Sequence, residues 1–270
     1  MSTEQAAFRA AYRAGISPRY NGVAHFIFVF GVGFGLIAWA LHQVDGGGWS
    51  PLAAPLTLLL ANINEWHIHK HYLHKRGHNR LAQLVWHRHT VEHHHYFTDQ
   101  EMRVDSTREY RIILFPAYGV LLVALQAAAL AALAALVFGA NTAWIVFASG
   151  VFFFMWYEGM HFLCHVDESA LVRHLPLVNT MRRNHMVHHC QALMTEQNMN
   201  LTFPFADWLF GSSDLQRGLW GTLFNGYSNA HLRPDIAERY RRLGIAPPVP
   251  HAQARPCAAR SRAQAPAQQP

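Results

Sequence analysis

The stretch IILFPAYGVLLVALQAAALAALAALVFGANTAWIVFASGVFFFMWY, residues 112–157, decides the fold. Its first 27 residues, 112–138, carry no charged side chain, and residues 143–157 are again apolar and aromatic. About 20 consecutive apolar residues are enough for a helix to cross the hydrocarbon core of a bilayer. Because only the short turn 139–142 separates the two runs, the stretch predicts a hairpin of two transmembrane helices.

A second hairpin is predicted nearer the N-terminus. Residues 23–44 form an apolar run, and the turn-forming sequence DGGGWSP follows at 45–51. Residues 51–63 form a shorter apolar run, which returns across the membrane if its helix continues into Glu65 and Trp66. These patterns predict an all-α integral membrane protein with about four transmembrane helices in two hairpins, of which the second crossing has the weakest signal.

Three segments are predicted along the chain. Residues 1–22 form a cytosolic N-terminal segment, and residues 23–245 form the membrane domain. Residues 246–270 are rich in Pro, Ala and Gln and poor in large apolar side chains, which is typical of a disordered tail.

The basic residues predict the orientation in the membrane. All 22 Lys and Arg residues fall in the N-terminal segment, in residues 66–111 or after residue 157, and neither turn, 45–50 or 139–142, contains one. Cytoplasmic loops of membrane proteins carry the excess of positive charge, so both termini and the histidine-rich segments between the helices are predicted to be cytoplasmic. Because these charges flank apolar runs, nucleic acid is not an expected partner.

Most of the 20 histidines lie in four short clusters. The clusters are EWHIHKHYLHKRGH (65–78), WHRHTVEHHHYFTD (86–99), YEGMHFLCH (157–165) and RRNHMVHHC (182–190). Residues at i, i+3 and i+4 of an α-helix share one face and converge on one point. Neutral imidazole binds iron, zinc, copper and nickel. About ten such rings exceed the four to six positions around one first-row ion, so more than one metal ion is predicted.

These clusters resemble the motifs of the fatty acid hydroxylase and sterol desaturase superfamily of membrane di-iron oxygenases. The family pattern is HxxxxH, HxxHH, HxxxH and HxxHH, with paired membrane helices between the second and third motifs. The sequence LTFPFADWLFGS, 201–212, is similar to the family's D-W-x-F-G-T ending. The resemblance covers residues 65 to about 212, and it implies that ten histidines bind metal: His69, His74, His89, His93, His94, His161, His165, His185, His188 and His189.

Two points remain open in this assignment. The second cluster reads HTVEHHH, with three residues instead of two between its first histidine and the following pair. The resemblance selects His89, His93 and His94 there, and the alternatives are His87 and His95. In the first cluster, the family's choice of His69 competes with a stripe at helical spacing that consists of His67, His71, His74 and His78.

The resemblance also implies an activity. Two Fe²⁺ ions would use O₂ and electrons from a separate ferredoxin-, cytochrome- or reductase-type donor to attack an unactivated C–H bond of a membrane lipid. The HxxxH spacing of the third motif is closer to hydroxylases than to desaturases, which share the same site. No catalytic residue beyond the metal ligands is predicted, and Glu65 and Asp207 are expected to accept ring N–H bonds from the ligands.

One alternative comes from another class of protein. A membrane metal-binding or metal-transport protein also carries histidines near its helices. Such a protein needs polar or ionisable groups along its spans, and the apolar runs of this chain contain almost none. Within the oxygenase class, a lipid or sterol desaturase is the alternative.

Overall fold

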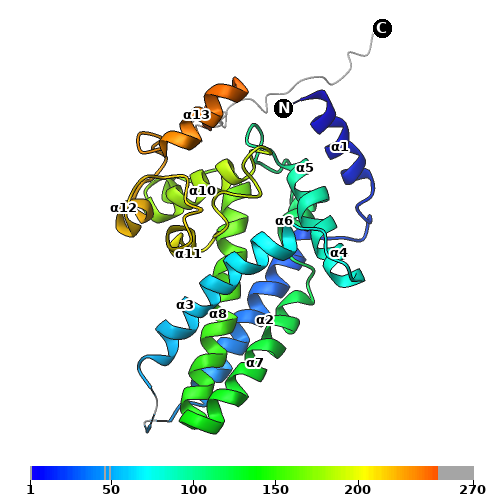
Figure 1. Ribbon diagram of the computed structural model, residues 1–270. Helices are drawn as coiled ribbons and strands as arrows, with labels where there is room; N and C mark the ends of the chain where they lie inside the picture. Colours follow the sequence, from blue (N-terminus) through cyan, green and yellow to red (C-terminus); the bar gives the residue numbers. More distant parts are fainter. Residues whose placement is uncertain (1, 46, 49, 249–270) are drawn as a thin grey trace.

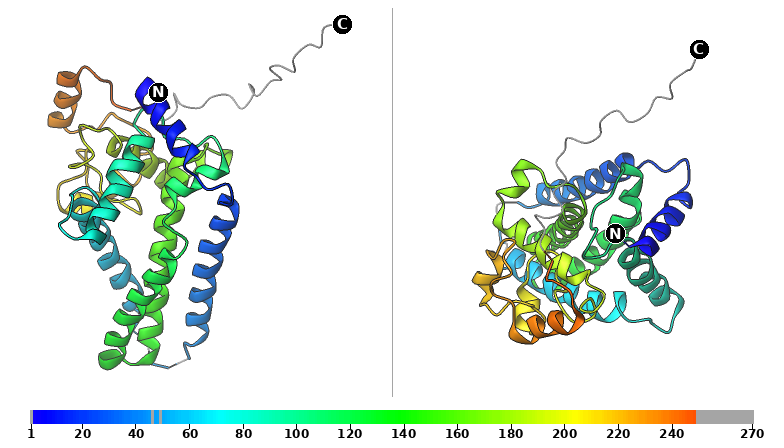
Figure 2. Two further views of the ribbon diagram at one scale, coloured as in Figure 1. Left: turned by 90° about the vertical axis from the view of Figure 1, so that its right-hand side faces the viewer. Right: turned by 90° about the horizontal axis from the view of Figure 1, so that it is seen from above.

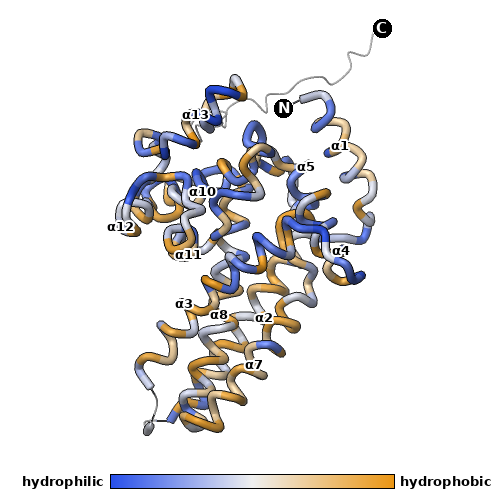
Figure 3. The backbone as a smooth tube through the Cα atoms, viewed as in Figure 1, coloured by the Kyte–Doolittle hydropathy of each residue, from blue (hydrophilic) through white to orange (hydrophobic). Residues whose placement is uncertain are grey.

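The computed structural model describes residues 2–45, 47–48 and 50–248, which form helices and loops without strands. Three helices are long and apolar enough to cross a membrane: α2 (Gly22–His42), α7 (Gly119–Phe138) and α8 (Ala140–His165). Figure 1 shows them side by side in the lower half of the molecule, and Figure 3 shows that this half is largely hydrophobic. Large side chains point outward from it, such as Leu125, which is 69% exposed. The all-α prediction is therefore confirmed for the described residues, and the three apolar helices fit an integral membrane protein.

α8 is the central helix, because α2, α3 (Ala53–Ile68) and α7 all pack against it. The approach of α2 to α8 is close at Gly33, where an added Cβ would stand 2.0 Å from Sδ of Met155. Gly150 of α8 has a similar role against α7, since its Cβ would stand 3.1 Å from that of Ala127. Small residues at such points let membrane helices pack tightly.

Two predicted boundaries differ from the structure. The run 112–138 does not form one helix, because the short helix α6 (Tyr110–Ile113) ends at Leu114, which is extended. Pro116 follows, which cannot donate a backbone hydrogen bond, and α7 begins only at Gly119. The helix expected over residues 143–157 is longer than predicted, since α8 continues to His165 and carries the whole third histidine motif.

The second predicted crossing corresponds to α3. This helix has 16 residues, which span about 24 Å at 1.5 Å per residue, less than the roughly 30 Å of a hydrocarbon core. It is thus not among the three helices that meet the length criterion. The fourth crossing stays a prediction.

The remaining elements form a cap at one end of the membrane helices (Figures 1 and 2). Within the predicted N-terminal segment, the structure forms α1 (Thr3–Ala14), whose Arg9 is buried and lies 3.3 Å from Asp105 and 3.5 Å from Glu109. The predicted tail, 246–270, lies outside the described residues from 249 onward. The other cap elements are η1 (His69–Leu73), α4 (Arg80–Trp86), η2 (His87–His93), α5 (His94–Tyr96), η3 (Thr107–Glu109), α9 (Ala170–Arg173), α10 (Pro176–His188), α11 (Phe205–Leu209), α12 (Leu219–Leu223) and α13 (Pro234–Leu243).

Candidate metal centre

All ten predicted histidines are buried, and nine of them form two groups whose ligand atoms lie within 4.8 Å of one another. The five-histidine group consists of His69, His74, His89, His94 and His188. The four-histidine group consists of His93, His161, His165 and His185.

Two π-helical turns position most of the five-histidine group. In η1 the N–H of His74 donates to the carbonyl of His69, five residues earlier, at 3.1 Å. In η2 the N–H of His94 donates to the carbonyl of His89, again five residues earlier. An ordinary α-helix would turn residues five apart toward different faces. π turns are rare and occur frequently at functional sites, and here each one brings a pair of histidines onto the same side.

The π turn in η2 explains the departure from the HxxHH pattern. The additional residue between His89 and the following pair is accommodated by the wider turn, so His89, His93 and His94 are all buried in the two groups. The two alternatives, His87 and His95, are exposed.

A π turn also decides which histidines of the first cluster lie in the candidate site. The π turn in η1 changes the helical phase after His69. Of the competing stripe, only His74 lies in a histidine group, whereas His67 and His78 are exposed and His71 is half-buried.

The other histidines come from ordinary α-helical spacing. His161 and His165 are four residues apart on α8 and belong to the four-histidine group. At the end of α10, His185 belongs to this group and His188 to the five-histidine group. His189 lies between the groups: its Nε2 is 3.1 Å from Nε2 of His185, and its ring stacks on that of His94 at 4.2 Å. The two groups therefore adjoin each other.

Backbone carbonyls orient five of the rings. In each ring Nδ1 lies 2.5 to 3.1 Å from a carbonyl oxygen, which only accepts hydrogen bonds, so Nδ1 carries the hydrogen. Nε2 of the neutral ring then presents its lone pair to the group, the form that binds a metal ion. The pairs of ring and carbonyl are His69 with Met199, His93 with Ile112, His165 with Met102, His188 with Gln197, and His189 with Phe97.

The Nε2 atoms lie at the spacing of ligands around an ion. Their contacts measure 2.9 to 3.2 Å. Nitrogens bound at 2.0–2.1 Å and at right angles are about 3 Å apart. Nε2 of His89 lies within 3.2 Å of three other Nε2 atoms, those of His69, His74 and His94, and a single N–H can donate to only one of them. The donor set thus fits metal ions better than hydrogen bonds among rings.

Burial keeps these rings neutral. It lowers the pKa of His69 to about 4 and the pKa of His93 to about 3. Burial, together with the neighbouring rings of His69 and His93, lowers the pKa of His74 to about 2. At pH 7 the rings are therefore free of the proton that would compete with a metal ion.

In comparisons with known proteins, no family model, curated protein or solved structure matches the chain.

The two predicted carboxylates accept hydrogen bonds from the backbone beside His69, and not from the histidine rings as expected. Glu65 accepts hydrogen bonds from the backbone N–H of Leu201 at 2.5 Å, and Asp207 accepts one from the N–H of Met199 at 2.7 Å. The carbonyl of Met199 in turn accepts from His69. Both carboxylates therefore hold the loop that orients a histidine, and the sequence gives no signal for the backbone carbonyls that contact the rings.

An apolar cavity of about 470 Å³ ends on the histidines. Both groups contribute to its inner end, with His69 and His89 from one and His93 and His161 from the other. Its walls are formed by α3, α7, α8 and the segment 112–118, together with Leu81, Leu84 and Val85 of α4. A chain-like apolar molecule lying between the membrane helices could thus reach both histidine groups.

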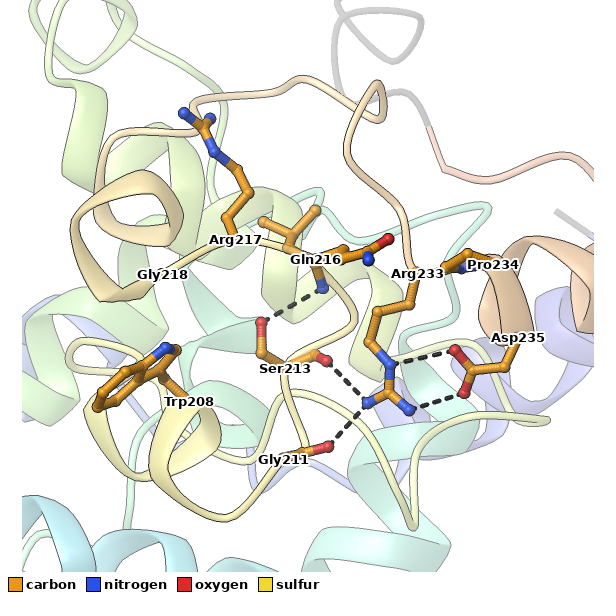
Figure 4. A pocket seen from close by; sticks show the side chains of 10 residues that line it. Trp208, Gly211, Ser213, Gln216, Arg217, Gly218, Arg233, Pro234 and Asp235 are labelled. Carbon is orange, nitrogen blue, oxygen red and sulfur yellow. Dashed lines mark hydrogen bonds and ion pairs between the residues drawn. The ribbon is translucent and has the colours of Figure 1, made fainter.

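A second pocket, of about 550 Å³, lies between α11 and the start of α13 (Figure 4). Its Arg233 is fully engaged, because it donates to the carbonyls of Gly211 and Ser213 and pairs with Asp235 at 2.7 Å. The histidine groups contribute no residue to its lining. This pocket is not part of the candidate metal centre.

Proposed function

We propose that this chain is an integral membrane di-iron oxygenase that hydroxylates a C–H bond of a membrane lipid. One observation carries the proposal: two adjoining groups of buried, neutral histidines form the inner end of an apolar cavity that extends along the candidate membrane helices α7 and α8. Two Fe²⁺ ions held there would supply O₂ activation for attack on an inert C–H bond, with electrons from a separate ferredoxin-, cytochrome- or reductase-type donor.

The protein's own groups would hold and orient this centre. Nine histidines supply neutral nitrogens, and backbone carbonyls fix the direction of five rings. The apolar cavity would exclude water and align the lipid chain so that one carbon lies beside the histidines.

Transport of a metal ion is a weaker explanation of the same residues. The spans α2 and α7 contain no Asp, Glu, Lys or Arg, and α8 contains only Glu158, which accepts a hydrogen bond from the backbone N–H of Phe115, so the three spans offer no row of charges along which a cation could pass. The histidine groups instead lie together at one end of the bundle, and by the positive-inside rule we place that end in the cytoplasm.

Lipid analysis tests the proposal directly. Host membranes that contain the chain and a competent electron donor are incubated with ¹⁸O₂, and their lipids are compared by mass spectrometry with those of His188→Ala membranes. We expect a lipid that gains one ¹⁸O atom with the wild-type chain and does not gain it with His188→Ala. His78→Ala, which removes an exposed histidine of the first cluster, is the control and should retain the activity.

Other outcomes discriminate between the alternatives. A lipid that loses two hydrogens without gaining label would indicate a desaturase that uses the same site. Identical lipids in all three membranes, with iron bound to the wild-type chain, would refute an oxygenase and favour a metal-binding protein.

A further inference from the structure

The cavity is a groove lined by one stripe from each of the helices α3, α7 and α8 and by the segment 112–118. On α8 the lining residues run from Gly150 to His161 at helical spacing, and on α7 they run from Gly119 to Gln126. The distance from Gly150 to His161 along α8 is about 16 Å, since 11 residues each rise 1.5 Å. The groove therefore extends deep along the membrane helices, away from the histidines.

The groove is lined by two amides, Asn64 of α3, which precedes Glu65, and Gln126, which lies at the far end of the groove on α7. Gln126 lies seven residues after Gly119, the first residue of α7, so it is about 10 Å along that helix. The contact of Ala127 with Gly150 places it at the end of the groove opposite His161. The neighbouring lining residues of α7, Leu122 and Val123, are apolar.

The side chain of Gln126 is exposed on α7, one of the helices that we place in the membrane, and it makes no hydrogen bond within the described part of the chain. In hydrocarbon an unpaired amide costs several kcal/mol. Polar side chains in membrane helices are rare and mark functional positions. Because Gln126 lines the groove, a molecule in the groove can supply the missing partner.

We propose that Gln126 determines substrate specificity by hydrogen-bonding a polar group of the lipid, such as a hydroxyl, an ester or an amide. This inference rests on the proposed function. An extended chain advances about 1.2 Å per bond, so the roughly 16 Å between the two ends of the groove correspond to about a dozen bonds. The substrate therefore carries a polar group about a dozen bonds from the carbon that is oxidised.

Lipid binding gives a test that does not depend on turnover. The wild-type chain, Gln126→Leu and Leu125→Ala are purified into nanodiscs made from host lipid, and the lipids that remain bound are identified by mass spectrometry. Leu125 is 69% exposed and does not line the groove, so Leu125→Ala is the matched control. We expect a lipid with such a polar group to be retained by the wild type and by Leu125→Ala, and to be lost from Gln126→Leu.

Turnover measurements then test the predicted distance between the polar group and the oxidised carbon. With ¹⁸O₂ and a reductant, Gln126→Leu should oxidise the natural lipid at least 10-fold more slowly, the effect of about 1.4 kcal/mol. Leu122 lies one helical turn nearer the histidines on the same wall. The double variant Leu122→Gln, Gln126→Leu moves the amide by about 6 Å. It should therefore favour lipids whose polar group is about five bonds closer to the oxidised carbon.

Three results would overturn the inference. The first is equal lipid retention and equal turnover by the wild type and Gln126→Leu, and the second is a labelled lipid without a polar group at this spacing. The third is a smaller oligomer on substitution of Gln126, which would show that its partner is another copy of the chain. If neither the wild type nor any variant transfers ¹⁸O to a lipid, the proposed function is wrong. Selective loss of the bound lipid from Gln126→Leu would even then support the proposal that Gln126 binds the polar group of a lipid in the groove.

Discussion

The π turn in η2 makes a prediction about a deletion. A π turn contains one residue more than the α-helical turn it replaces. Removing Glu92 from HTVEHHH should therefore restore an α-helical turn and leave His89, His93 and His94 in nearly the same places. Glu92 is suitable because its described interaction is a 3.6 Å ion pair with His87, with the two side chains 30% and 56% exposed. Such an exposed pair contributes about 0–1 kcal/mol.

An insertion at the same point should have the opposite effect. One added alanine after Glu92 rotates the following residues by about 100° and moves them about 1.5 Å along the helix. Metal–ligand distances tolerate only about 0.2 Å. His93 and His94 belong to different groups, so the insertion should displace a ligand from both metal positions.

The assay is iron content per chain after anaerobic loading with Fe²⁺, measured by elemental mass spectrometry on detergent-purified protein. The Glu92 deletion should bind as much iron as the wild type, whereas the insertion should bind almost none. Deletion of Ala82, in the ordinary α-helix α4, serves as the control for a shift of helical register and should also lose iron. If deletion of Glu92 lowers the iron content as much as the insertion does, the π turn does not explain the HxxxHH spacing.

Three further predictions follow from the same geometry. His93→Ala should halve the iron content and leave the five-histidine group loaded; complete loss of iron would show that the two groups do not bind independently. In thermal melts, the metal-free protein should lose stability as the pH falls from about 6.5 towards 4. The reason is that histidines of the unfolded chain have a pKa of about 6.5, whereas burial lowers the pKa of His69 to about 4, so the unfolded chain binds more protons in this range. An unchanged melting temperature over this range would contradict the burial of neutral rings. Asp207→Asn should weaken the hydrogen bonds to the loop beside His69. It should lower the free energy of unfolding by about 1–3 kcal/mol and the Tm by several degrees. A variant whose Tm equals that of the wild type would show that this carboxylate does not hold the loop.

The sequence by itself determined the membrane character of the chain and the residues of the candidate site. Apolar runs of helical length are a local property, so the helices α2, α7 and α8 could be predicted, although the start of α7 required Pro116 to be taken into account. Histidine clusters beside the ends of these runs are equally visible in the sequence.

Only the tertiary structure decided how the histidines are arranged. Spacing alone could not separate His89, His93 and His94 from His87 and His95, because the π turn of η2 changes which residues share a face of the helix. The division into two groups also joins residues more than 100 positions apart, such as His74 and His188. The ring orientations depend on backbone carbonyls that have no sequence signature, and the groove exists only where α3, α7, α8 and the segment 112–118 meet. Local sequence patterns therefore determined the helices and the candidate histidines, and long-range packing determined how these histidines form the site.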